Sequence, residues 1–455
     1  MVVSSESLLQ SLNAEQQQAV LHTNGPMLII AGPGSGKTRV ITHRAAHLLL
    51  NGHLNKASVL AVTFTNKAAS ELKSRIGQMN VTNQERITSS TFHSFCARLL
   101  RTHGTYVGLD RNYTIYDSDD QLSAIKESMA IAEVDTKQTN PRSIQNLISK
   151  SKASGNDARM MAQNAETYFE ELAATIYSKY EELLQRNNAA DFDDLIFKAV
   201  DLLSNNISIR ESYNYNYQQV MIDEFQDTNA SQYKLTKLLV HDHQNLTVVG
   251  DPNQSIYSWR NADIKNILNF QDDFPSAKVI SINQNYRSTP NILKTARNII
   301  TTNELNLDNE IFTKNPEGSP VISHEAFDGL DEAEFVITEA KQLTSGRHAK
   351  YKLKDIAVMY RVNAQSRVIE EACLKSSVKY RIVGGIQFYQ RKEIKDLLSY
   401  LSVISNPADD ISLVRAISNP GRGIGKKTIE SLKDYSVNQE SSMSDALKKL
   451  HASVT

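Results

Sequence analysis

The chain has 455 residues, of which 40% are hydrophobic and 22% charged, a composition typical of a soluble globular protein with room for about three domains. Lys and Arg (50) nearly balance Asp and Glu (51), so the net charge of −1 gives no overall attraction to a polyanion, and a nucleic acid would need a local basic groove. The two cysteines, Cys96 and Cys373, are far apart and no apolar run approaches about 18 residues, so we expect a cytoplasmic protein without disulfides, signal peptide or membrane span.

The N-terminal part of the chain predicts a nucleotide site. Residues 8–20 are expected to form a short helix, and residues 27–30 a short buried strand. The sequence AGPGSGKT (31–38) follows, and the next twelve residues have apolar side chains at helical spacing. This order of strand, loop and helix is the context that a phosphate-binding P-loop requires. A chance glycine-rich turn is the alternative, and Ala31 stands where the strict pattern has glycine.

Each residue type in this loop has a physical role. Gly32, Gly34 and Gly36 lack a Cβ atom, so the backbone can point several N–H groups at one anion. The helix that follows adds the positive end of its dipole. Lys37 is expected to reach the β- and γ-phosphates, and the Thr38 hydroxyl to bind Mg²⁺.

Strands and helices alternate on both sides of a helical block. Residues 105–190 are charged and helical without clear strands, which indicates a helical insertion. Apolar runs that read as strands stand before and after it, at 58–64, 86–95, 218–224, 246–252 and 277–282. The alternation predicts an α/β fold with a parallel sheet, and the polar residues after each strand are expected to meet at one edge of it.

Two acidic residues end the predicted strand at 218–224. Asp223 is placed to hold Mg²⁺ through its water shell, and Glu224 to orient and deprotonate the attacking water in phosphoryl transfer. Adjacent acids also occur at strand ends by chance, but the P-loop upstream favours the catalytic interpretation.

The segment VGDPNQSIYSWRNA (249–262) combines two kinds of residue. Gln254 is placed to sense a γ-phosphate at the end of a strand. Tyr257, Trp259 and Arg260 supply two aromatic faces and a cation, the combination that stacks and neutralises single-stranded nucleic acid. Core packing is the alternative for the two aromatic residues.

The second half of the chain predicts a second unit of alternating strands and helices. Its expected helices are 291–300 and 332–343, and its expected strands are 319–327 and 355–361. From about residue 378 the pattern is helical again and includes the turn NPGRGIGKKT at 419–428.

Nine motifs carry a resemblance to a known family. In chain order they are LNAEQQQAV, AGPGSGKT, TFTNKAA, TFHSF, DFDDLI, DEFQDTN, GDPNQSIYSWR, QNYRS and DIAVMYRVNAQSR. Their order resembles that of UvrD/Rep/PcrA-like superfamily 1 DNA helicases over essentially the whole chain. The resemblance implies a P-loop NTPase with a RecA-like parallel-sheet domain and a helical insertion, a partial second RecA-like domain and a partial helical accessory domain. The implied ranges are 1–104 with 191–282 for the first motor domain, 105–190 for the insertion, 283–377 for the second motor domain and 378–455 for the accessory domain.

The resemblance also implies a function. It implies an ATP-dependent 3′→5′ DNA helicase or translocase that couples ATP hydrolysis to movement on single-stranded DNA, in DNA repair or replication. The implied cofactors are ATP and Mg²⁺. The implied partners are single-stranded DNA and junctions of single and double strands, without a membrane, and the implied location is the cytoplasm, on the nucleoid when the protein is bound to DNA.

Roles at the nucleotide follow from the matching motif positions. Gln16 would read the adenine edge, Tyr286 would stack near the base, and Arg287 would reach the γ-phosphate as an arginine finger. The implied catalytic residues are Lys37, Thr38, Asp223, Glu224, Gln254 and Arg287, with Thr38 and Asp223 as the Mg²⁺ ligands. The implied nucleotide-binding residues are Gln16, Ala31, Gly32, Pro33, Gly34, Ser35, Gly36, Lys37, Thr38, Arg39, Tyr286 and Arg287.

The family resemblance places a single-strand track on other motifs. The implied DNA-binding residues are Thr63, Phe64, Thr65, Asn66, His93, Tyr257, Trp259, Arg260, Arg361 and Asn363. DFDD (191–194) looks like a metal cluster but falls on a structural motif of the family. GRGIGKKT (421–428) resembles a turn that contacts duplex phosphates through backbone N–H groups, with a plain helix corner as the alternative.

Two later motifs of the family, of Lys-Gly-Leu-Glu and Thr-Arg-Ala type, are not found after Thr428. We therefore expect the second motor domain to be incomplete and the C-terminal helicase motifs to be absent. One alternative is a DNA-binding ATPase module that cannot unwind DNA without a missing C-terminal part or a second polypeptide. Another is a P-loop kinase for small molecules, against which the DNA-track motifs argue.

Overall fold

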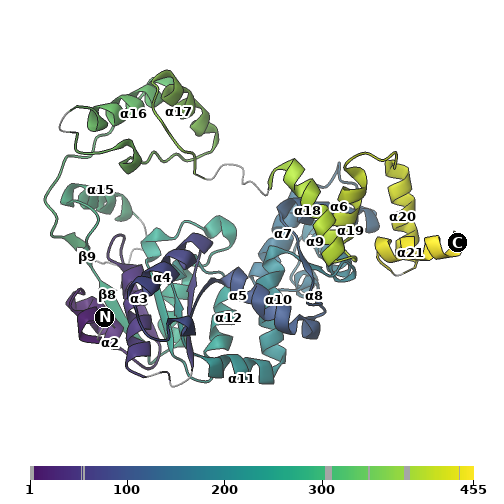
Figure 1. The fold of residues 1–455 in the computed structure, drawn as a ribbon, viewed down its shortest axis with the longest axis horizontal. Helices are drawn as coiled ribbons and strands as arrows, with labels where there is room; N and C mark the ends of the chain where they lie inside the picture. Colours follow the sequence, from purple (N-terminus) through teal and green to yellow (C-terminus); the bar gives the residue numbers. More distant parts are fainter. Residues whose placement is uncertain are drawn as a thin grey trace. The chain divides into compact units, whose positions relative to one another are not determined.

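The computed structural model describes residues 5–52, 54, 57–302, 310–346, 349–383, 390–439 and 441–454. Within these ranges the largest sheet has six parallel strands in the order β3-β2-β6-β7-β1-β8 (Figure 1). Their bounds are β1 Met27–Ala31, β2 Ser58–Thr63, β3 Ile87–Thr91, β6 Tyr217–Ile222, β7 Leu246–Gly250 and β8 Lys278–Ile282. The predicted α/β fold with a parallel sheet is confirmed.

Alternate residues of each strand face opposite sides of this sheet, and both sides are buried. Leu28 and Val248 pack in one core cluster, whereas Met27 and Val249 pack in the other. Strands buried on both faces are typical of parallel sheets, because connecting helices cover each face. The near-continuous apolar runs in the sequence therefore have a direct structural cause.

The two faces are covered by different helices. The core that contains Met27 includes residues of helices α1 Ser5–Leu9, α2 Ala14–Leu21, α3 Lys37–Leu50 and α4 Asn66–Gln78. The core that contains Leu28 includes residues of α5 Phe92–His103, α10 Phe192–Asn205, α11 Ile207–Asn216, α12 Ala230–Leu239, α13 Lys265–Leu268 and α14 Phe270–Asp273. The single helix predicted at 8–20 is wrong, because Asn13 caps a new helix with its side chain and separates α1 from α2.

The carboxyl ends of the central strands carry the polar motifs. β1 leads into the P-loop, β2 into Phe64, β6 into Asp223 and β7 into Asp251. Ile29 pairs with Val249 and Ile280 on its two sides, so the strands end at the same edge. Loops at this edge are where open α/β sheets bind ligands.

A helical block follows α5 and returns to the sheet at α10. It consists of α6 Ser118–Ile131, α7 Pro141–Ala153, α8 Ala158–Gln163 and α9 Tyr168–Arg186, with a small parallel ladder between β4 Thr114–Ile115 and β5 Ala189–Ala190. Its core contains Ile125, Ile148, Tyr177 and Tyr180.

The C-terminal helices pack against this block. They are α18 Lys392–Ser405, α19 Asp410–Ser418, α20 Lys426–Asn438 and α21 Met443–Val454 (yellow-green to yellow in Figure 1). The buried Asn406 Nδ2 donates to the carbonyl oxygens of Asn187 and Asn188, and Tyr116 donates to the Asp409 carboxylate. Residues 1–318 and 396–455 accordingly form one compact unit.

Residues 319–395 form a second compact unit. Its helices α16 Gly329–Thr344 and α17 Ala364–Lys375 pack through Ile337 and Cys373. The segments 319–327 and 355–361, predicted as strands, are not strands in the structure. A strand needs a hydrogen-bonded neighbour, and no described segment of this unit pairs with either of them. The domain borders at 104, 190, 282 and 377 stay a prediction of the sequence.

Three further elements, β9, α15 and β10, lie in sequence between β8 and the second compact unit. β9 Gln284–Asn285 pairs in parallel with β10 Phe312–Thr313, and α15 Pro290–Ile300 lies between them in sequence. Over the described residues, no helix combines the length and the hydropathy that crossing a membrane requires.

Candidate nucleotide site and aromatic surface

The P-loop turns sharply between β1 and α3. Gly34 and Gly36 have φ angles of +67° and +91°, in the left-handed region that favours glycine. A Cβ atom on Gly34 would lie 2.6 Å from Cβ of Arg287, so a side chain there would also collide. Ser35 Oγ donates to the Gly32 carbonyl at 2.7 Å and fixes the curl of the loop. Both the conformation and the space therefore require glycine at Gly34.

Five of the six predicted catalytic residues meet beside this loop. Lys37, the first residue of α3, donates from Nζ to Glu224 Oε2 at 2.8 Å and to Gln254 Oε1 at 3.4 Å. Thr38 Oγ1 donates to Asp223 Oδ2 at 3.3 Å. Since these residues follow β1, β6 and β7, the strand order brings them together.

The two carboxylates of this group differ in environment. Asp223 is buried, and burial together with the neighbouring Glu224 raises its pKa to about 6. Glu224 has a φ of +51°, an uncommon conformation for a residue with a side chain, and it pairs with Lys37. Backbone strain of this kind clusters at functional sites.

The Thr38 hydroxyl and the Asp223 carboxylate fit a magnesium ion. They are hard oxygen donors whose oxygens lie 3.3 Å apart, and Mg²⁺ is commonly held by one or two protein oxygens together with substrate phosphates.

The acidic motif DFDD (191–194) has a structural role and not the metal-binding role that its sequence suggested. Asp191 and Asp194 form the capping box of α10 and are both bound by Lys152, so they are structural.

Gln16 is buried against the P-loop. Its Nε2 donates to the Ser35 carbonyl at 2.8 Å and its Oε1 accepts from the Asn13 N–H at 3.1 Å. The side chain thus braces the loop, and its reading of adenine stays a prediction. Arg39 is partly exposed on α3.

Tyr286 and Arg287 lie beside the P-loop. The Tyr286 N–H donates to the Gly34 carbonyl at 2.9 Å, and its ring is partly exposed. Arg287 follows directly, and its Cβ lies close to Gly34.

Two residues of this site were not predicted from the sequence. Gln226 donates from Nε2 to Glu224 Oε2 at 3.0 Å and accepts from the Asp251 N–H at 3.1 Å, so it braces Glu224 against the end of β7. Asn285 binds both the P-loop and the segment of Arg287. Both stand inside the DEFQDTN and QNYRS motifs, and that position was the available signal.

Aromatic side chains form a partly exposed cluster at the same edge of the sheet. The rings of Phe64 and Tyr257 stack with centroids 4.6 Å apart, and the centroids of Tyr257 and Trp259 are 6.3 Å apart. The Arg260 guanidinium lies 4.6 Å from the Trp259 ring centroid. Trp259 is 70% exposed, so core packing does not account for it. We call Phe64, Tyr257, Trp259 and Arg260 the aromatic surface.

His93 and Phe192 make a second aromatic contact. Their ring centroids are 5.5 Å apart in an edge-to-face arrangement, and Phe192 is 54% exposed at the start of α10. Burial, with a smaller effect of Arg260, lowers the pKa of His93 to about 4, so its ring is neutral at pH 7. Phe192 was not predicted, because a single phenylalanine among the acidic residues of DFDD carries no signal of its own.

The remaining predicted track residues are divided between the two compact units. Thr65 caps α4 and is exposed, Asn66 Oδ1 accepts from Thr91, and Thr63 is buried at the end of β2. Arg361 and Asn363 are exposed in the second unit, just before α17. The turn before α20 is also exposed.

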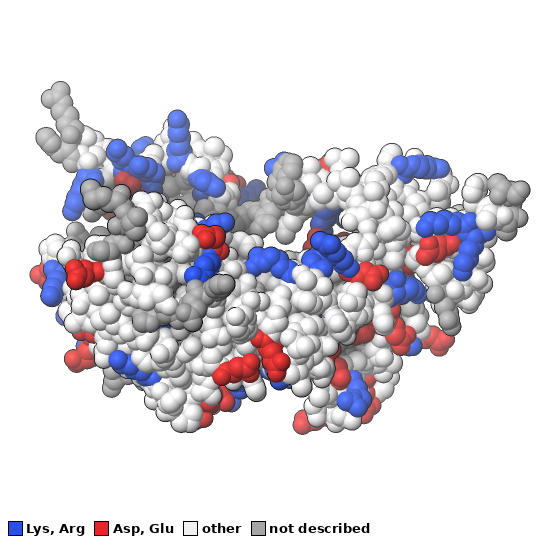
Figure 2. All heavy atoms as spheres, turned by 60° about the horizontal axis from the view of Figure 1, so that its bottom comes forward, with Lys and Arg blue, Asp and Glu red and all other residues white. Residues whose placement is uncertain are grey.

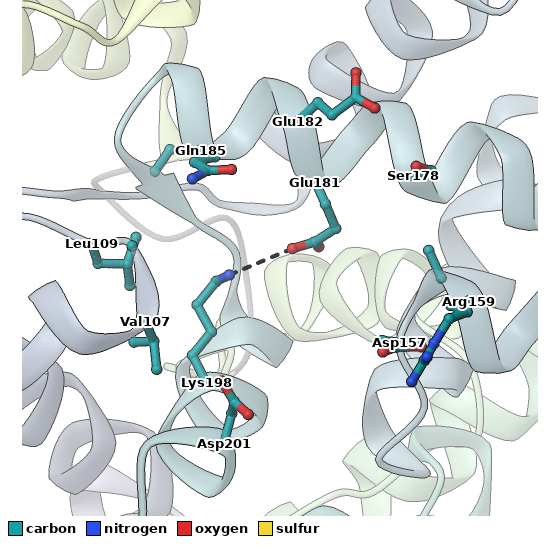
Figure 3. Close-up of a pocket in the computed structure, with 13 residues that line it drawn as sticks. Val107, Leu109, Asp157, Arg159, Ser178, Glu181, Glu182, Gln185, Lys198 and Asp201 are labelled. Atoms are coloured by element: carbon teal, nitrogen blue, oxygen red, sulfur yellow. Dashed lines mark hydrogen bonds and ion pairs between the residues drawn. The ribbon is translucent and has the colours of Figure 1, made fainter. Parts of the chain in front are cut away.

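A separate cavity lies in the helical insertion. It has a volume of about 570 Å³ and is lined from α9 and α10, where Lys198 faces Glu181 at 3.5 Å (Figure 3). Glu181 also pairs with Lys152, so its charge is neutralised within the protein.

On the face drawn in Figure 2, basic and acidic side chains are interspersed, which agrees with the near-zero net charge.

Comparison with known families decides the class of protein. The model of the UvrD/REP helicase N-terminal domain matches residues 12–275, more than half of the chain. The chain belongs to the UvrD/REP helicase family. The model of the UvrD-like helicase C-terminal domain matches residues 280–454. The prediction that the C-terminal helicase part is absent is therefore wrong: the C-terminal domain is represented, although two short motifs were not found.

Relatives in this helicase family cover nearly the whole chain. A protein named ATP-dependent DNA helicase PcrA from Staphylococcus aureus (strain Mu50) is 46% identical over 441 residues, which are 97% of this chain and 60% of the relative. A PcrA protein from Staphylococcus epidermidis (strain ATCC 12228) is 45% identical over 445 residues, 98% of this chain and 60% of the relative. The chain thus spans about 60% of the length of these relatives.

Proposed function

We propose that this chain is the motor of an ATP-dependent DNA helicase that moves 3′→5′ on single-stranded DNA. The observation that carries the proposal is the contact of Lys37 with both Glu224 and Gln254. Gln254 begins the segment 254–259, which ends in Trp259. The segment 254–259 therefore links the proposed phosphate-binding lysine and its carboxylate partner to the aromatic side chains of Tyr257 and Trp259. The PcrA relatives, which are named ATP-dependent DNA helicases, support the same function.

ATP hydrolysis would proceed between the P-loop and the end of β6. The N–H groups of the loop and the Lys37 ammonium would hold the β- and γ-phosphates. Thr38 and Asp223 would hold Mg²⁺, which supplies charge neutralisation on the phosphate oxygens. On ATP binding, Lys37 would exchange Glu224 for phosphate, and the released Glu224 carboxylate would accept a proton from the attacking water. Arg287 would stabilise the charge of the transferred phosphoryl group.

Gln254 would connect hydrolysis to DNA. Its Nε2 donates to Asp251 at 2.7 Å while its Oε1 accepts from Lys37. A change in the position of Lys37 would therefore alter the hydrogen bonds at the start of the segment that ends in Tyr257 and Trp259.

The aromatic surface would stack the bases of a single strand. Base stacking on Phe64, Tyr257 and Trp259 does not depend on sequence, since every base has a π face. Neutral His93 would donate a hydrogen bond to a phosphate, sugar or base, and Phe192 beside it would extend the stacking surface. Thr65, Asn66 and Arg260 of the same unit would contact the strand beside these rings, whereas Thr63 is buried. Arg361 and Asn363 of the second compact unit stay predicted DNA-binding residues.

The proposal includes the predicted setting of the protein. The partners would be single-stranded DNA and its junctions with duplex, the process repair or replication, and the location the cytoplasm, with the nucleoid when DNA is bound. The match of the C-terminal model over 280–454 does not favour a module that lacks this domain, and no contact with a second polypeptide is needed for the proposal.

Strand separation tests the proposal. We expect ATP-dependent unwinding of a duplex with a 3′ single-stranded tail, and no unwinding of the same duplex with a 5′ tail. ATP hydrolysis stimulated by DNA without strand separation from either tail would instead support the alternative of an ATPase module. Preference for the 5′ tail would contradict the proposed polarity.

A further inference from the structure

Asn285 connects the P-loop to the segment that carries Arg287. It is the last residue of β9, it is 1% exposed, and it lies 252 positions along the chain from Pro33, which it contacts. Its Nδ2 donates to the Pro33 carbonyl at 2.5 Å. Its Oδ1 accepts from the N–H groups of Arg287 at 2.8 Å and Ser288 at 2.7 Å.

These contacts use both halves of the amide. The carbonyl oxygen of the Asn285 side chain accepts from the backbone N–H groups two and three residues later, which fixes the turn that contains Arg287. Asparagine side chains often stabilise turns in this way. The NH₂ group binds the P-loop, which the turn itself does not require. Aspartate would lose the donor and serine is too short to reach Pro33, so asparagine suits both tasks.

A second bond reinforces the connection. The Tyr286 N–H donates to the Gly34 carbonyl at 2.9 Å, so two consecutive carbonyl groups of the loop are bound by consecutive residues, Asn285 and Tyr286. The close approach of Gly34 to the Arg287 Cβ shows how little space separates the two segments.

We propose that Asn285 is a positioning residue that transmits the conformation of the P-loop to Arg287. When the P-loop moves around a bound γ-phosphate, the hydrogen bond between Asn285 and Pro33 moves the turn at Asn285–Ser288 with the loop. This movement places the Arg287 side chain beside the γ-phosphoryl group. The inference rests on the proposed ATP hydrolysis and adds a residue that acts through Arg287 and the loop.

A purely structural role predicts a different outcome. If Asn285 only held the fold together, its loss would lower stability and weaken every nucleotide equally. A positioning role instead lowers kcat more than it raises KM, and it leaves ADP binding intact because ADP lacks the γ-phosphate that Arg287 would contact.

The experiment compares Asn285→Ala and Asn285→Ser with wild type and with Asn298→Ala, an exposed asparagine of α15. Serine can still accept a hydrogen bond within the turn but does not reach Pro33. We expect both Asn285 variants to lower kcat for ATP hydrolysis on single-stranded oligothymidylate by about 10- to 100-fold, as misplacement by about 1 Å does. Their dissociation constants for ADP should stay within about threefold of wild type. Asn298→Ala should match wild type in both measurements.

Three results are decisive against the inference. Normal kcat in Asn285→Ser would show that the bond to Pro33 is dispensable. Equal weakening of ADP and of a non-hydrolysable ATP analogue would indicate a structural role. Absence of ATP hydrolysis in the wild-type chain would instead overturn the proposed function, on which the inference rests.

Discussion

At the scale of single residues, the proposed nucleotide site centres on the hydrogen bonds of Lys37. Glu224 and Gln254 both accept from its ammonium group, and ATP phosphates would take their place. A lysine can serve in this way because it is a point charge on a flexible stem. The nucleotide site and the aromatic surface are then separate sets of side chains joined by the segment 254–259.

Substitution of Lys37 tests this separation. We expect Lys37→Ala to abolish ATP turnover, because the phosphates lose their main cationic partner, while the affinity for single-stranded DNA without nucleotide stays near that of wild type. Fluorescence anisotropy of a labelled oligonucleotide and a phosphate-release assay measure the two effects. Loss of DNA binding in the absence of nucleotide would show that the two sites are not separate.

Substitution of Trp259 tests the aromatic surface. Trp259→Ala should weaken single-strand binding by about 1–3 kcal/mol, the range for losing one stacked base. Tyr168→Ala is the matched control, because Tyr168 is 79% exposed but lies on α9 outside the aromatic surface. Unchanged affinity in Trp259→Ala, with the fold preserved, would remove this residue from the track.

At the scale of elements, a buried lysine joins α7 to α10 and α12. Lys152 of α7 pairs with Asp191 and Asp194 at the start of α10, and its backbone carbonyl accepts from Ser231 of α12. Burial alone would lower the pKa of Lys152, but Asp191, Asp194 and Glu181 raise it well above its usual value, so the side chain stays charged. Phe192 lies between the two aspartates, and its position therefore depends on this lysine.

Removal of this charge should destabilise the fold. Lys152→Met leaves two carboxylates buried without their cation, and breaking a buried pair in this way costs about 3–5 kcal/mol. Lys150→Met on the same helix replaces an exposed lysine and should change stability by less than about 0.5 kcal/mol. Denaturant unfolding followed by circular dichroism compares the variants, and equal stability of both would contradict the account.

The start of α19 should respond to pH. Burial raises the pKa of Asp410 to about 6 from 3.8, against the opposing effects of the Met443 N–H, Arg186 and Lys433, while Glu127 adds to the rise. The folded chain therefore holds this proton more tightly than the unfolded chain. Stability is lost as the pH rises from about 4 to about 6, and the loss is complete above pH 6.

Asp410→Asn removes this cost and retains an oxygen for the Met443 N–H. Relative to wild type, the variant should gain about 1–3 kcal/mol of stability at pH 8, and the gain should fade as the pH drops toward 4. Thermal unfolding at several pH values measures the difference. A gain that does not depend on pH would contradict the assigned pKa.

At the scale of the whole molecule, the strand-end motifs were predictable from the sequence and their bracing partners were not. A parallel sheet brings the carboxyl ends of its strands to one edge, so the order of strands and motifs along the chain is enough to group Lys37, Asp223 and Gln254. Gln226 and Asn285 each bind a backbone atom of a neighbouring loop, and Gln226 also binds the Glu224 side chain. Their places inside DEFQDTN and QNYRS do not reveal these contacts by themselves.

Two errors at this scale have physical reasons. The expected strands at 319–327 and 355–361 have apolar patterns, but a strand forms only against a neighbour, which the sequence does not display. The second motor domain was expected to be incomplete because two short C-terminal motifs were not found, whereas the pattern over 280–454 as a whole matches the C-terminal domain of the family. This chain spans about 60% of the length of its relatives. The central question is therefore whether the chain itself hydrolyses ATP in response to DNA.

Steady-state ATP turnover with and without single-stranded DNA answers that question most directly. We expect turnover of the purified chain to rise when oligothymidylate is added, and to fall to background in Lys37→Ala under both conditions. Turnover that is the same with and without DNA, or that survives in Lys37→Ala, would contradict a DNA motor driven from this P-loop.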